Sequence, residues 1–255
     1  MPPAGDRPPA NLFRFPVSLW YTVTAMRQVK AVIFDVGGTL VEGAMPWYDL
    51  YQRALVLAAH PLPARQMVAC YEAALRHMMA DRQTAVSPEA SRLRGLNSYL
   101  AAEFELTEAR LQHAVDEVIF DYPEARHLVC AEGVHECLTE LQARRYRLAV
   151  ISNWSADLPR VLSQLGIRHH FEAVFASEAL GYAKPNPAAF LVPLDRLGLT
   201  AGTAAYVGDL YDVDVVGARD VGMTPILVDP LGLGLHGDVT AIVHLSELLG
   251  IFTGA

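Results

Sequence analysis

The chain has 255 residues, of which 52% are hydrophobic, enough to build a sizeable core in one large domain or in a domain with an insertion. Its net charge of −8 argues against nucleic acid or an anionic membrane as the main partner, and no apolar run approaches the roughly twenty residues that a membrane-spanning helix needs. The three cysteines are an odd number without zinc-type spacing, which argues against a disulfide framework and favours a reducing, cytoplasmic location.

The first 25 residues differ from the rest of the chain. They are rich in proline and polar residues, and the moderately apolar stretch after Pro16 is short and weak for a secretory signal. The first strand-like run begins soon after Met26. We therefore interpret residues 1–25 as a disordered leader, or as the result of a start assigned too early.

Residues 31–34, with the sequence AVIF, form a short apolar run that ends at Asp35 and a glycine turn. This pattern is typical of a buried parallel strand. Over residues 42–124 the pattern changes, and apolar residues recur at spacings of three and four in 47–59, 64–80, 88–103 and 107–120. We expect an all-helical segment there.

Helices and strands are then expected to alternate up to the C-terminus. Alternation of this kind predicts an α/β fold with a doubly wound parallel sheet. The expected helices cover residues 134–145, 158–165, 188–197 and 213–220, and the expected strands cover 148–151, 174–175, 204–207, 225–228 and 242–243.

Polar residues follow three of these strands: Asp35, the pair Ser152-Asn153, and Asp209. Because open α/β sheets bind ligands outside the carboxyl ends of their strands, we expect these side chains to converge. Lys184 lies in the segment GYAKPNP, ahead of the last of these strands, and is one of only two lysines beside eighteen arginines. A compact cation among carboxylates at a sheet edge suggests a phosphate site.

In this order and context, Asp35, Ser152, Lys184 and Asp209 resemble the four motifs of the haloacid dehalogenase superfamily of hydrolases. The resemblance spans residues 29–251 and is most specific in its second half, where KPNP is followed by VGD and by DVVGA. It implies a Rossmann-like core formed by residues 26–41 and 125–255. It also implies an inserted all-helical cap, residues 42–124, that closes over the site.

The resemblance implies catalytic roles for two residues. Asp35 would attack phosphorus and form an aspartyl-phosphate, and Lys184 would pair with both this carboxylate and the transferring phosphoryl group. Four further residues would bind the phosphate oxygens: Gly38, Thr39, Ser152 and Asn153.

The resemblance also implies a Mg²⁺ site, because this ion prefers oxygens from carboxylates, carbonyls, water and substrate phosphate. Asp35 and Asp209 would supply carboxylates, and Gly37 would supply a backbone carbonyl. Asp214 would bind through water or orient Asp209, and Asp212 is the competing candidate for this position.

Gly37 departs from the family pattern. Phosphatases of the family usually carry a second aspartate at this position, which protonates the leaving group and activates water, and losing such an acid/base typically removes about two to four orders of magnitude of rate. Three consequences are open. In the first, the substrates have good leaving groups that need no acid. In the second, an acid is recruited from elsewhere, and Glu42 and Asp49 are the nearest downstream candidates. In the third, the protein binds phosphorylated ligands with little turnover.

The sequence therefore favours a Mg²⁺-dependent phosphatase of a small phosphorylated metabolite, acting as a monomer or homodimer. A 2-haloacid dehalogenase is the alternative enzyme, since Asp35 could attack carbon and release halide without a metal, although Gly208-Asp209 suits phosphoryl chemistry better. A phosphonate-cleaving enzyme would need a cap lysine, and no lysine occurs between Lys30 and Lys184. The remaining hypothesis is a catalytically weak protein that binds phosphorylated ligands.

Overall fold

The computed structural model describes residues 28–45, 47–63, 66–67, 69–70, 73, 97–121 and 127–253. The predicted leader, most of the predicted helix 64–80 and the first part of the predicted helix 88–103 lie outside these residues. Among the helices in the described ranges, none combines the length and the apolar character that crossing a membrane requires.

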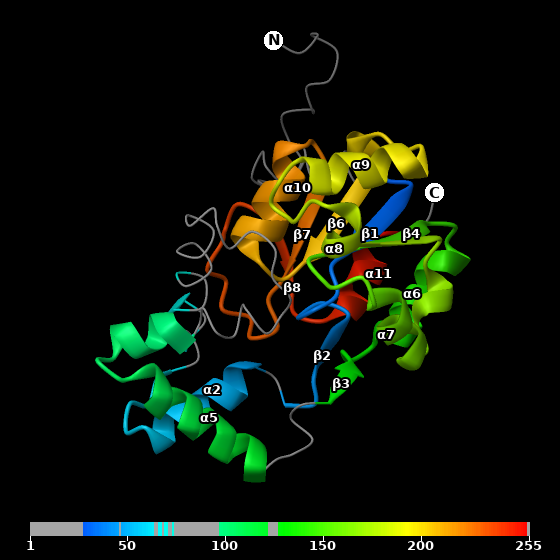
Figure 1. The fold of residues 1–255 in the computed structure, drawn as a ribbon. Coiled ribbons are helices and arrows are strands. Elements are labelled where there is room, and N and C mark those ends of the chain that lie inside the picture. Colours follow the sequence, from blue (N-terminus) through cyan, green and yellow to red (C-terminus); the bar gives the residue numbers. More distant parts are fainter. Residues whose placement is uncertain are drawn as a thin grey trace, which may run out of the picture.

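Six parallel strands form one sheet, and the described residues packed around it, 28–41 and 127–253, are called the large domain below (Figure 1). Their order across the sheet is β5-β4-β1-β6-β7-β8, so the first strand of the chain lies inside the sheet and later strands are added on both sides. This confirms the predicted doubly wound α/β fold, with the last strand slightly earlier than predicted. The strands are β1 (Ala31–Phe34), β4 (Arg147–Ser152), β5 (Ala173–Ala176), β6 (Ala204–Gly208), β7 (Thr224–Val228) and β8 (Thr240–Ile242).

Helices cover both faces of this sheet (Figure 1). Successive side chains of a strand point to opposite faces, and accordingly Val32 and Phe34 pack in one hydrophobic cluster while Ile33 packs in another. Burial on both faces explains why the strands are apolar runs without alternation. The first face is covered by α6 (Val134–Ala143), α7 (Leu158–Gln164) and α11 (Leu248–Ile251), and the second by α9 (Ala188–Leu197) and α10 (Val216–Asp220).

Short helical turns complete the connections between these elements. The predicted helix 213–220 is divided in the structure, because a wider π-helical turn precedes α10. The turns are η3 (Arg168–His170), α8 (Ser177–Leu180), η4 (Ala201–Thr203), the π-helical η5 (Tyr211–Val215) and η6 (Leu245–Glu247).

Two short strands form a second sheet that the sequence pattern does not predict. β2 (Val41–Gly43) pairs antiparallel with β3 (Leu128–Cys130), and the two strands flank the helical segment in the chain. Each has only three residues and its partner lies far away in sequence, so no local pattern reveals the pairing. The chain leaves the large domain through β2 and returns through β3 (Figure 1).

The described helices between β2 and β3 have a hydrophobic cluster of their own. α2 (Trp47–Leu57) and α5 (Glu108–Asp121) lie side by side, and Leu55 is fully buried in the cluster. The same cluster includes Leu210 and Val213, which belong to the large domain. The helical segment therefore contacts the loop that follows β6, at the carboxyl end of the sheet.

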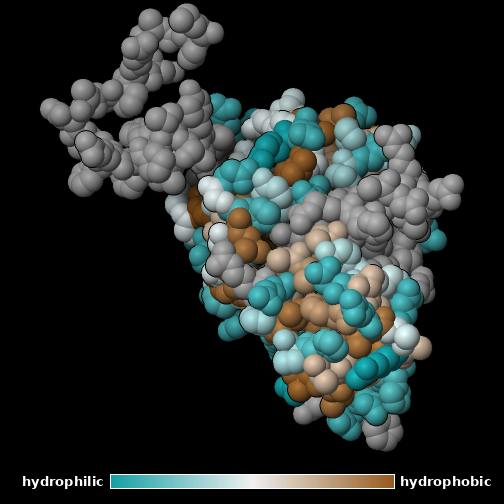
Figure 2. Space-filling view, turned by 90° about the vertical axis from the view of Figure 1, so that its left-hand side faces the viewer, coloured by the Kyte–Doolittle hydropathy of each residue, from teal (hydrophilic) through white to brown (hydrophobic). Residues whose placement is uncertain are grey.

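The surface of the helical segment carries apolar residues among hydrophilic ones, as the lower part of Figure 2 shows. Val56 and Leu57, at the C-terminal end of α2, are 60% and 54% exposed. Leu50 and Tyr51 of the same helix are buried. α2 thus buries one side, as its predicted spacing of apolar residues requires.

Candidate active site

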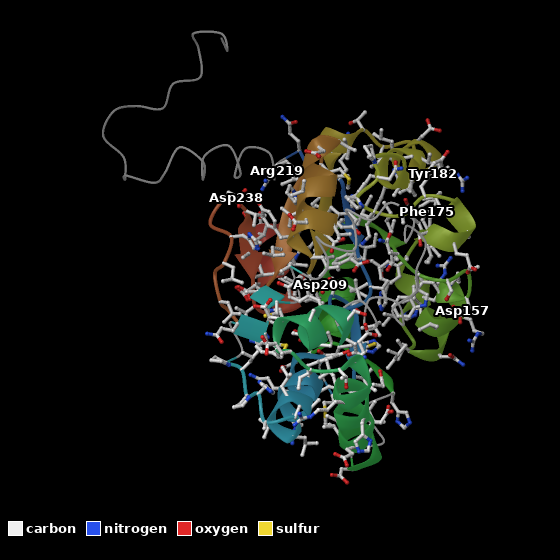
Figure 3. The ribbon with its side chains drawn as sticks, turned by 60° about the vertical axis from the view of Figure 1, so that its left-hand side comes forward. Asp157, Phe175, Tyr182, Asp209, Arg219 and Asp238 are labelled. Carbon is white, nitrogen blue, oxygen red and sulfur yellow. The ribbon has the colours of Figure 1, made fainter. Side chains whose placement is uncertain are left out.

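The ends of three neighbouring strands bring predicted site residues together. Asp35 follows β1, Ser152 ends β4 and Asp209 follows β6, and β1 lies between β4 and β6. The backbone N–H of Asp35 donates to the carbonyl oxygen of Val207 (2.8 Å), so the chain stays paired with β6 beyond the end of β1. Asp209 lies where the large domain meets the helical segment (Figure 3). The expected convergence of these residues is present in the structure.

The loop between α8 and α9 inserts Lys184 into this cluster. Its ammonium Nζ donates to Oδ1 of Asp35 (2.7 Å), to Oδ1 of Asp214 (2.6 Å) and to the hydroxyl of Tyr206 (2.7 Å). The side chains of Lys184, Asp35 and Asp214 are at most 1% exposed. All three N–H donors of the ammonium therefore have an acceptor inside the protein.

Asn153 holds the backbone of Lys184 in place. Its Oδ1 accepts a hydrogen bond from the backbone N–H of Lys184 (2.7 Å), and its Nδ2 donates to the carbonyl oxygen of the same residue (2.9 Å). The sequence predicts Asn153 as a phosphate ligand, and the structure adds this second role for its side chain. The residue that follows β4 thus positions the cation that faces Asp35.

Burial and charge act in opposite directions on the buried ion pairs. Burial alone would lower the pKa of Lys184, but the carboxylates of Asp214 and Asp35 raise this pKa above its ordinary value. Burial raises the pKa of Asp214, while Lys184 opposes this effect and Asp35 adds to it. The ammonium is therefore held in its charged form between two carboxylates that repel each other.

Tyr206 is a contact of Lys184 that the sequence does not reveal directly. It belongs to the α9 face of the sheet, where its ring packs edge-on against Phe190 with the centroids 5.2 Å apart. Its hydroxyl accepts a hydrogen bond from Lys184 and donates one to the carbonyl oxygen of Ile151 (2.7 Å). The available signal is a tyrosine inside an otherwise aliphatic strand, because a buried phenol usually needs a hydrogen-bond partner.

Three carboxylates form a group that could hold a metal ion. One oxygen each from Asp35, Asp209 and Asp214 lies within 4.8 Å of the others. Lys184 balances one of the three negative charges, so one divalent cation would balance the other two. Carboxylate oxygens suit Mg²⁺, and the residues therefore fit the predicted ion. Of the two acids considered for the outer position, Asp214 belongs to the group and Asp212 does not.

Gly38 allows the turn after β1 to approach Asp209 closely. Its φ angle of +79° lies in the left-handed region that favours glycine. A Cβ at this position would overlap Oδ2 of Asp209. The backbone N–H of Gly38 donates to the carbonyl oxygen of Val41 (2.8 Å), which closes the turn. The turn that carries Gly37 and Gly38 is thus held against the carboxylate group.

Two hydroxyls in the site are buried without a hydrogen-bond partner among the described residues. They are Oγ1 of Thr39, in the turn after Asp35, and Oγ of Ser152, at the end of β4. A buried polar group that lacks a hydrogen bond costs about 1–3 kcal/mol. An anion bound at the carboxyl edge of the sheet would satisfy both hydroxyls.

Hydrogen bonds hold the π-helical turn η5 both on its inner side, which faces the buried site, and on its outer side, at the protein surface. On the inner side, Oδ2 of Asp214 accepts a hydrogen bond from the backbone N–H of Leu210 (3.0 Å). On the outer side, the hydroxyl of Tyr211 donates to Asp238 (2.6 Å), which also forms an ion pair with Arg219 (2.9 Å; Figure 3). These contacts explain how the turn directs Asp214 towards Lys184.

Gly37 faces an aromatic side chain rather than an acid. A Cβ built on Gly37 would lie 3.5 Å from Cζ3 of Trp154. Glu42, one candidate for a recruited acid, lies in β2, where burial and then the charge of Glu132 raise its pKa. Asp49, the other candidate, lies in the first turn of α2. Neither candidate belongs to the carboxylate group.

The order and spacing of these residues agree with a known protein family. A family model described as haloacid dehalogenase-like hydrolase matches residues 29–222, which is most of the chain. The chain belongs to the haloacid dehalogenase-like hydrolases. The matched residues include Asp35, Ser152, Lys184, Asp209 and Asp214, and the predicted superfamily is confirmed.

Individual members of the family match parts of this hydrolase. Haloacid dehalogenase-like hydrolase domain-containing protein 3 from Homo sapiens is 43% identical over 97 residues, 38% of this chain and 39% of that protein. Glyceraldehyde 3-phosphate phosphatase from Methanothermobacter thermautotrophicus is 38% identical over 93 residues, 36% of this chain and 41% of that protein. Both matches thus span less than half of the relative's own length.

A solved structure matches over nearly the whole fold of this hydrolase. The crystal structure of 2-haloacid dehalogenase from Pseudomonas syringae pv. Tomato has a TM-score of 0.54 and 28% identity. The match covers 88% of this chain and 98% of that chain. Because relatives named as a phosphatase and as a dehalogenase both match, the fold alone does not separate these two activities.

Replacing Tyr206 with phenylalanine is expected to reduce the turnover of this hydrolase and to lower its free energy of unfolding by about 1–3 kcal/mol. The change keeps the ring but leaves an N–H of Lys184 and the carbonyl of Ile151 without their partner. Urea unfolding measures the loss. Tyr146→Phe is the matched control, since Tyr146 is buried with its ring against Phe252, just before β4 begins. Equal losses of unfolding free energy in Tyr206→Phe and Tyr146→Phe would contradict the role assigned to the Tyr206 hydroxyl.

Proposed function

We propose that this protein is a Mg²⁺-dependent phosphatase that hydrolyses a small phosphorylated metabolite through an aspartyl-phosphate at Asp35. The observation that carries the proposal is the buried ion pair between Lys184 and Asp35, beside a group of three carboxylates. A nucleophilic carboxylate, a cation for the phosphoryl group and oxygen donors for a divalent metal are the parts that phosphoryl transfer uses. The relative named as a phosphatase supports the same chemistry.

The proposed reaction has two half-reactions. In the first, a carboxylate oxygen of Asp35 attacks phosphorus, and the bond between phosphorus and the leaving oxygen breaks. In the second, water attacks the aspartyl-phosphate, which releases inorganic phosphate and regenerates the carboxylate. Lys184 stays within hydrogen-bond distance of Asp35 and offsets the negative charge of the phosphoryl group. Mg²⁺, when bound, supplies further positive charge next to the phosphate oxygens.

Asp35, Asp209 and the backbone carbonyl of Gly37 would hold the metal ion. Asp214 would act behind them, because its two oxygens already accept hydrogen bonds from Lys184 and from a backbone N–H. We therefore assign Asp214 to orienting the site or to binding the ion through water.

Three of the four predicted residues would bind the phosphate group, and the fourth would make room for it. The hydroxyls of Thr39 and Ser152 are buried and have no hydrogen-bond partner in the described part of the chain, which supports their role as phosphate ligands. Asn153 would contribute its backbone N–H, since its side chain is bound to Lys184. Gly38 would make room for the phosphate group because it has no side chain. Its backbone N–H already donates to the carbonyl oxygen of Val41 within the turn.

The helical segment, residues 42–124, would act as a cap on a core formed by residues 26–41 and 125–255. The contacts of Leu210 and Val213 with the helical cluster support this proposal, since both residues lie close in sequence to Asp209. A cap of this kind excludes water from the site and supplies contacts to the substrate. We also propose a cytoplasmic location and a monomeric or homodimeric state, which composition and resemblance support.

Dehalogenation is the second candidate function, and the match to a 2-haloacid dehalogenase structure favours it. Asp35 would then attack carbon and displace a halide ion. This chemistry needs no divalent cation, so the three clustered carboxylates would be balanced by Lys184 alone. The carboxylate group therefore favours phosphoryl transfer.

The test is hydrolysis of 4-nitrophenyl phosphate with Mg²⁺ and with EDTA. We expect turnover that requires Mg²⁺ and disappears in Asp35→Asn. Asp157→Asn is the matched control, because Asp157 is an exposed aspartate at the start of α7, away from Asp209 in Figure 3. Undiminished turnover in Asp35→Asn would contradict the proposal. Halide release from 2-chloropropionate without phosphate hydrolysis would favour the second candidate.

A further inference from the structure

We propose that Gly37 and Trp154 form an apolar wall beside the nucleophile and restrict the enzyme to phosphates whose leaving group departs as a stable anion without protonation. Aryl phosphates and acyl phosphates share this chemistry. The inference rests on the proposed phosphatase function and names the substrate class of that same site. Three observations carry it: the geometry of Gly37, the attachment of Trp154 and the set of groups around Asp35.

The side chain that Gly37 lacks would project towards an indole ring. Gly37 lies two residues after Asp35 and is not among the glycines with a positive φ angle, so its backbone does not demand glycine. A Cβ at this position would lie 3.5 Å from Cζ3 of Trp154, in ordinary van der Waals contact. The ring of Trp154 is thus the neighbour that a carboxyl group at position 37 would meet first.

Trp154 is held by hydrogen bonds to its carbonyl oxygen and lies next to Asn153. Its carbonyl oxygen accepts hydrogen bonds from the backbone N–H of Glu178 (3.2 Å) and from the hydroxyl of Ser177 (3.3 Å). Its neighbour Asn153 forms the two hydrogen bonds to the backbone of Lys184. The ring is partly buried against the hydrophobic cluster of the large domain. Trp154 thus adjoins the residue that positions Lys184.

The described charged groups around Asp35 already have other contacts. Asp209 and Asp214 belong to the carboxylate group that suits a cation, and the ammonium of Lys184 donates to three acceptors. Hydrolysis of a phosphate ester with an alkyl leaving group is about two to four orders of magnitude slower when no general acid protonates the leaving oxygen. Phenolate and carboxylate leaving groups reduce this loss, because phenols and carboxylic acids are stronger acids than alkyl alcohols and their anions depart more readily without a proton.

The proposed step transfers no proton to the leaving group. An oxygen of Asp35 forms a bond to phosphorus, and the electron pair of the breaking P–O bond departs with the phenolate or the carboxylate. Water then attacks the aspartyl-phosphate, so that inorganic phosphate and the Asp35 carboxylate form and a proton passes to the solvent. The indole of Trp154 also suits an aromatic leaving group, because aromatic rings pack favourably against each other.

The first test compares kcat/KM, which reports the first half-reaction, for four phosphates in the presence of Mg²⁺. We expect 4-nitrophenyl, phenyl and acetyl phosphate to be hydrolysed and propyl phosphate to be at least ~100-fold slower than phenyl phosphate. If propyl phosphate is within about tenfold of phenyl phosphate, this inference is wrong while the proposed function stands. If none of the four is hydrolysed, the proposed function itself fails.

The second test restores an acid with and without the indole ring. Gly37→Asp alone should gain little on propyl phosphate, whereas Gly37→Asp combined with Trp154→Ala should exceed it by at least ~10-fold. Trp154→Ala alone should raise KM for the aryl phosphates but not for acetyl phosphate, which serves as the internal control for folding. Equal gains in the hydrolysis of propyl phosphate by Gly37→Asp alone and by the double variant would contradict the proposed wall. Equal KM changes for aryl and acetyl phosphates would rule out contact between the ring and an aromatic leaving group.

Discussion

Replacing Lys184 with methionine is expected to lower the free energy of unfolding by about 3–5 kcal/mol and to abolish hydrolysis of 4-nitrophenyl phosphate. Methionine has a similar length but no charge, so Asp35 and Asp214 would keep their buried carboxylates without the ammonium that both contact. Removing one member of a buried ion pair is costly because the remaining charge is left uncompensated. Tyr206 would also lose the donor to its hydroxyl. Urea unfolding in EDTA measures the stability without a bound cation.

Lys30→Met is the matched control for this variant. Lys30 is the only other lysine of the chain and is exposed, immediately before β1. Substitutions at exposed positions usually change the free energy of unfolding by about 0.5 kcal/mol or less. Similar losses in Lys184→Met and Lys30→Met would show that the buried ion pairs do not contribute as proposed.

Replacing Gly38 with alanine is expected to weaken Mg²⁺ binding and turnover by about 10–100-fold. The added Cβ would overlap Oδ2 of Asp209 and force this carboxylate away from Asp35 and Asp214. The left-handed φ angle of +79° adds a strain of about 1–2 kcal/mol to the folded state. Calorimetric titration with Mg²⁺ measures the binding directly, independently of turnover.

Gly133→Ala is the control variant that separates the effect of backbone strain from the effect of the overlap with Asp209. Gly133 precedes α6 with a φ angle of +75°, and a Cβ there would meet nothing within 4 Å. This variant should lose about 1–2 kcal/mol of stability and keep its Mg²⁺ affinity and turnover. If Gly38→Ala also kept its Mg²⁺ affinity, Asp209 would not hold the ion in the way that the geometry suggests.

Most of the sheet could be predicted because its strands are buried on both faces. The central strands therefore appear as apolar runs that end in a polar residue, as at Phe34-Asp35 and Gly208-Asp209. The parallel arrangement then brings those polar ends to one edge. The predicted convergence of Asp35, Ser152 and Asp209 follows from this rule alone.

The contacts that complete the site could not be predicted, because they depend on how distant segments approach each other. Tyr206 resembles a core residue in the sequence, and its contact with Lys184 exists only because the loop before α9 returns to the sheet. The side chain of Asn153 binds the same loop. The position of Trp154 opposite Gly37 likewise joins two segments that are far apart in the chain.

The choice between Asp212 and Asp214 depends on a local detail that has no clear sequence signal. Both acids lie in the π-helical turn η5, and an ordinary helical pattern does not say which of them points inwards. The structure buries Asp214 and joins it to the backbone N–H of Leu210. Turns of this kind are rare in proteins and are often found at functional sites.

Leu210 and Val213 join the loop that carries the acids of the site to the helical segment. Both side chains lie in the hydrophobic cluster of α2 and α5, and both flank acids of the site in the chain. A swing of the helical segment about the β2–β3 strands would have to break these contacts or carry the loop after β6 with it. A displacement of α2 and α5 would therefore act directly on the loop that carries Asp209.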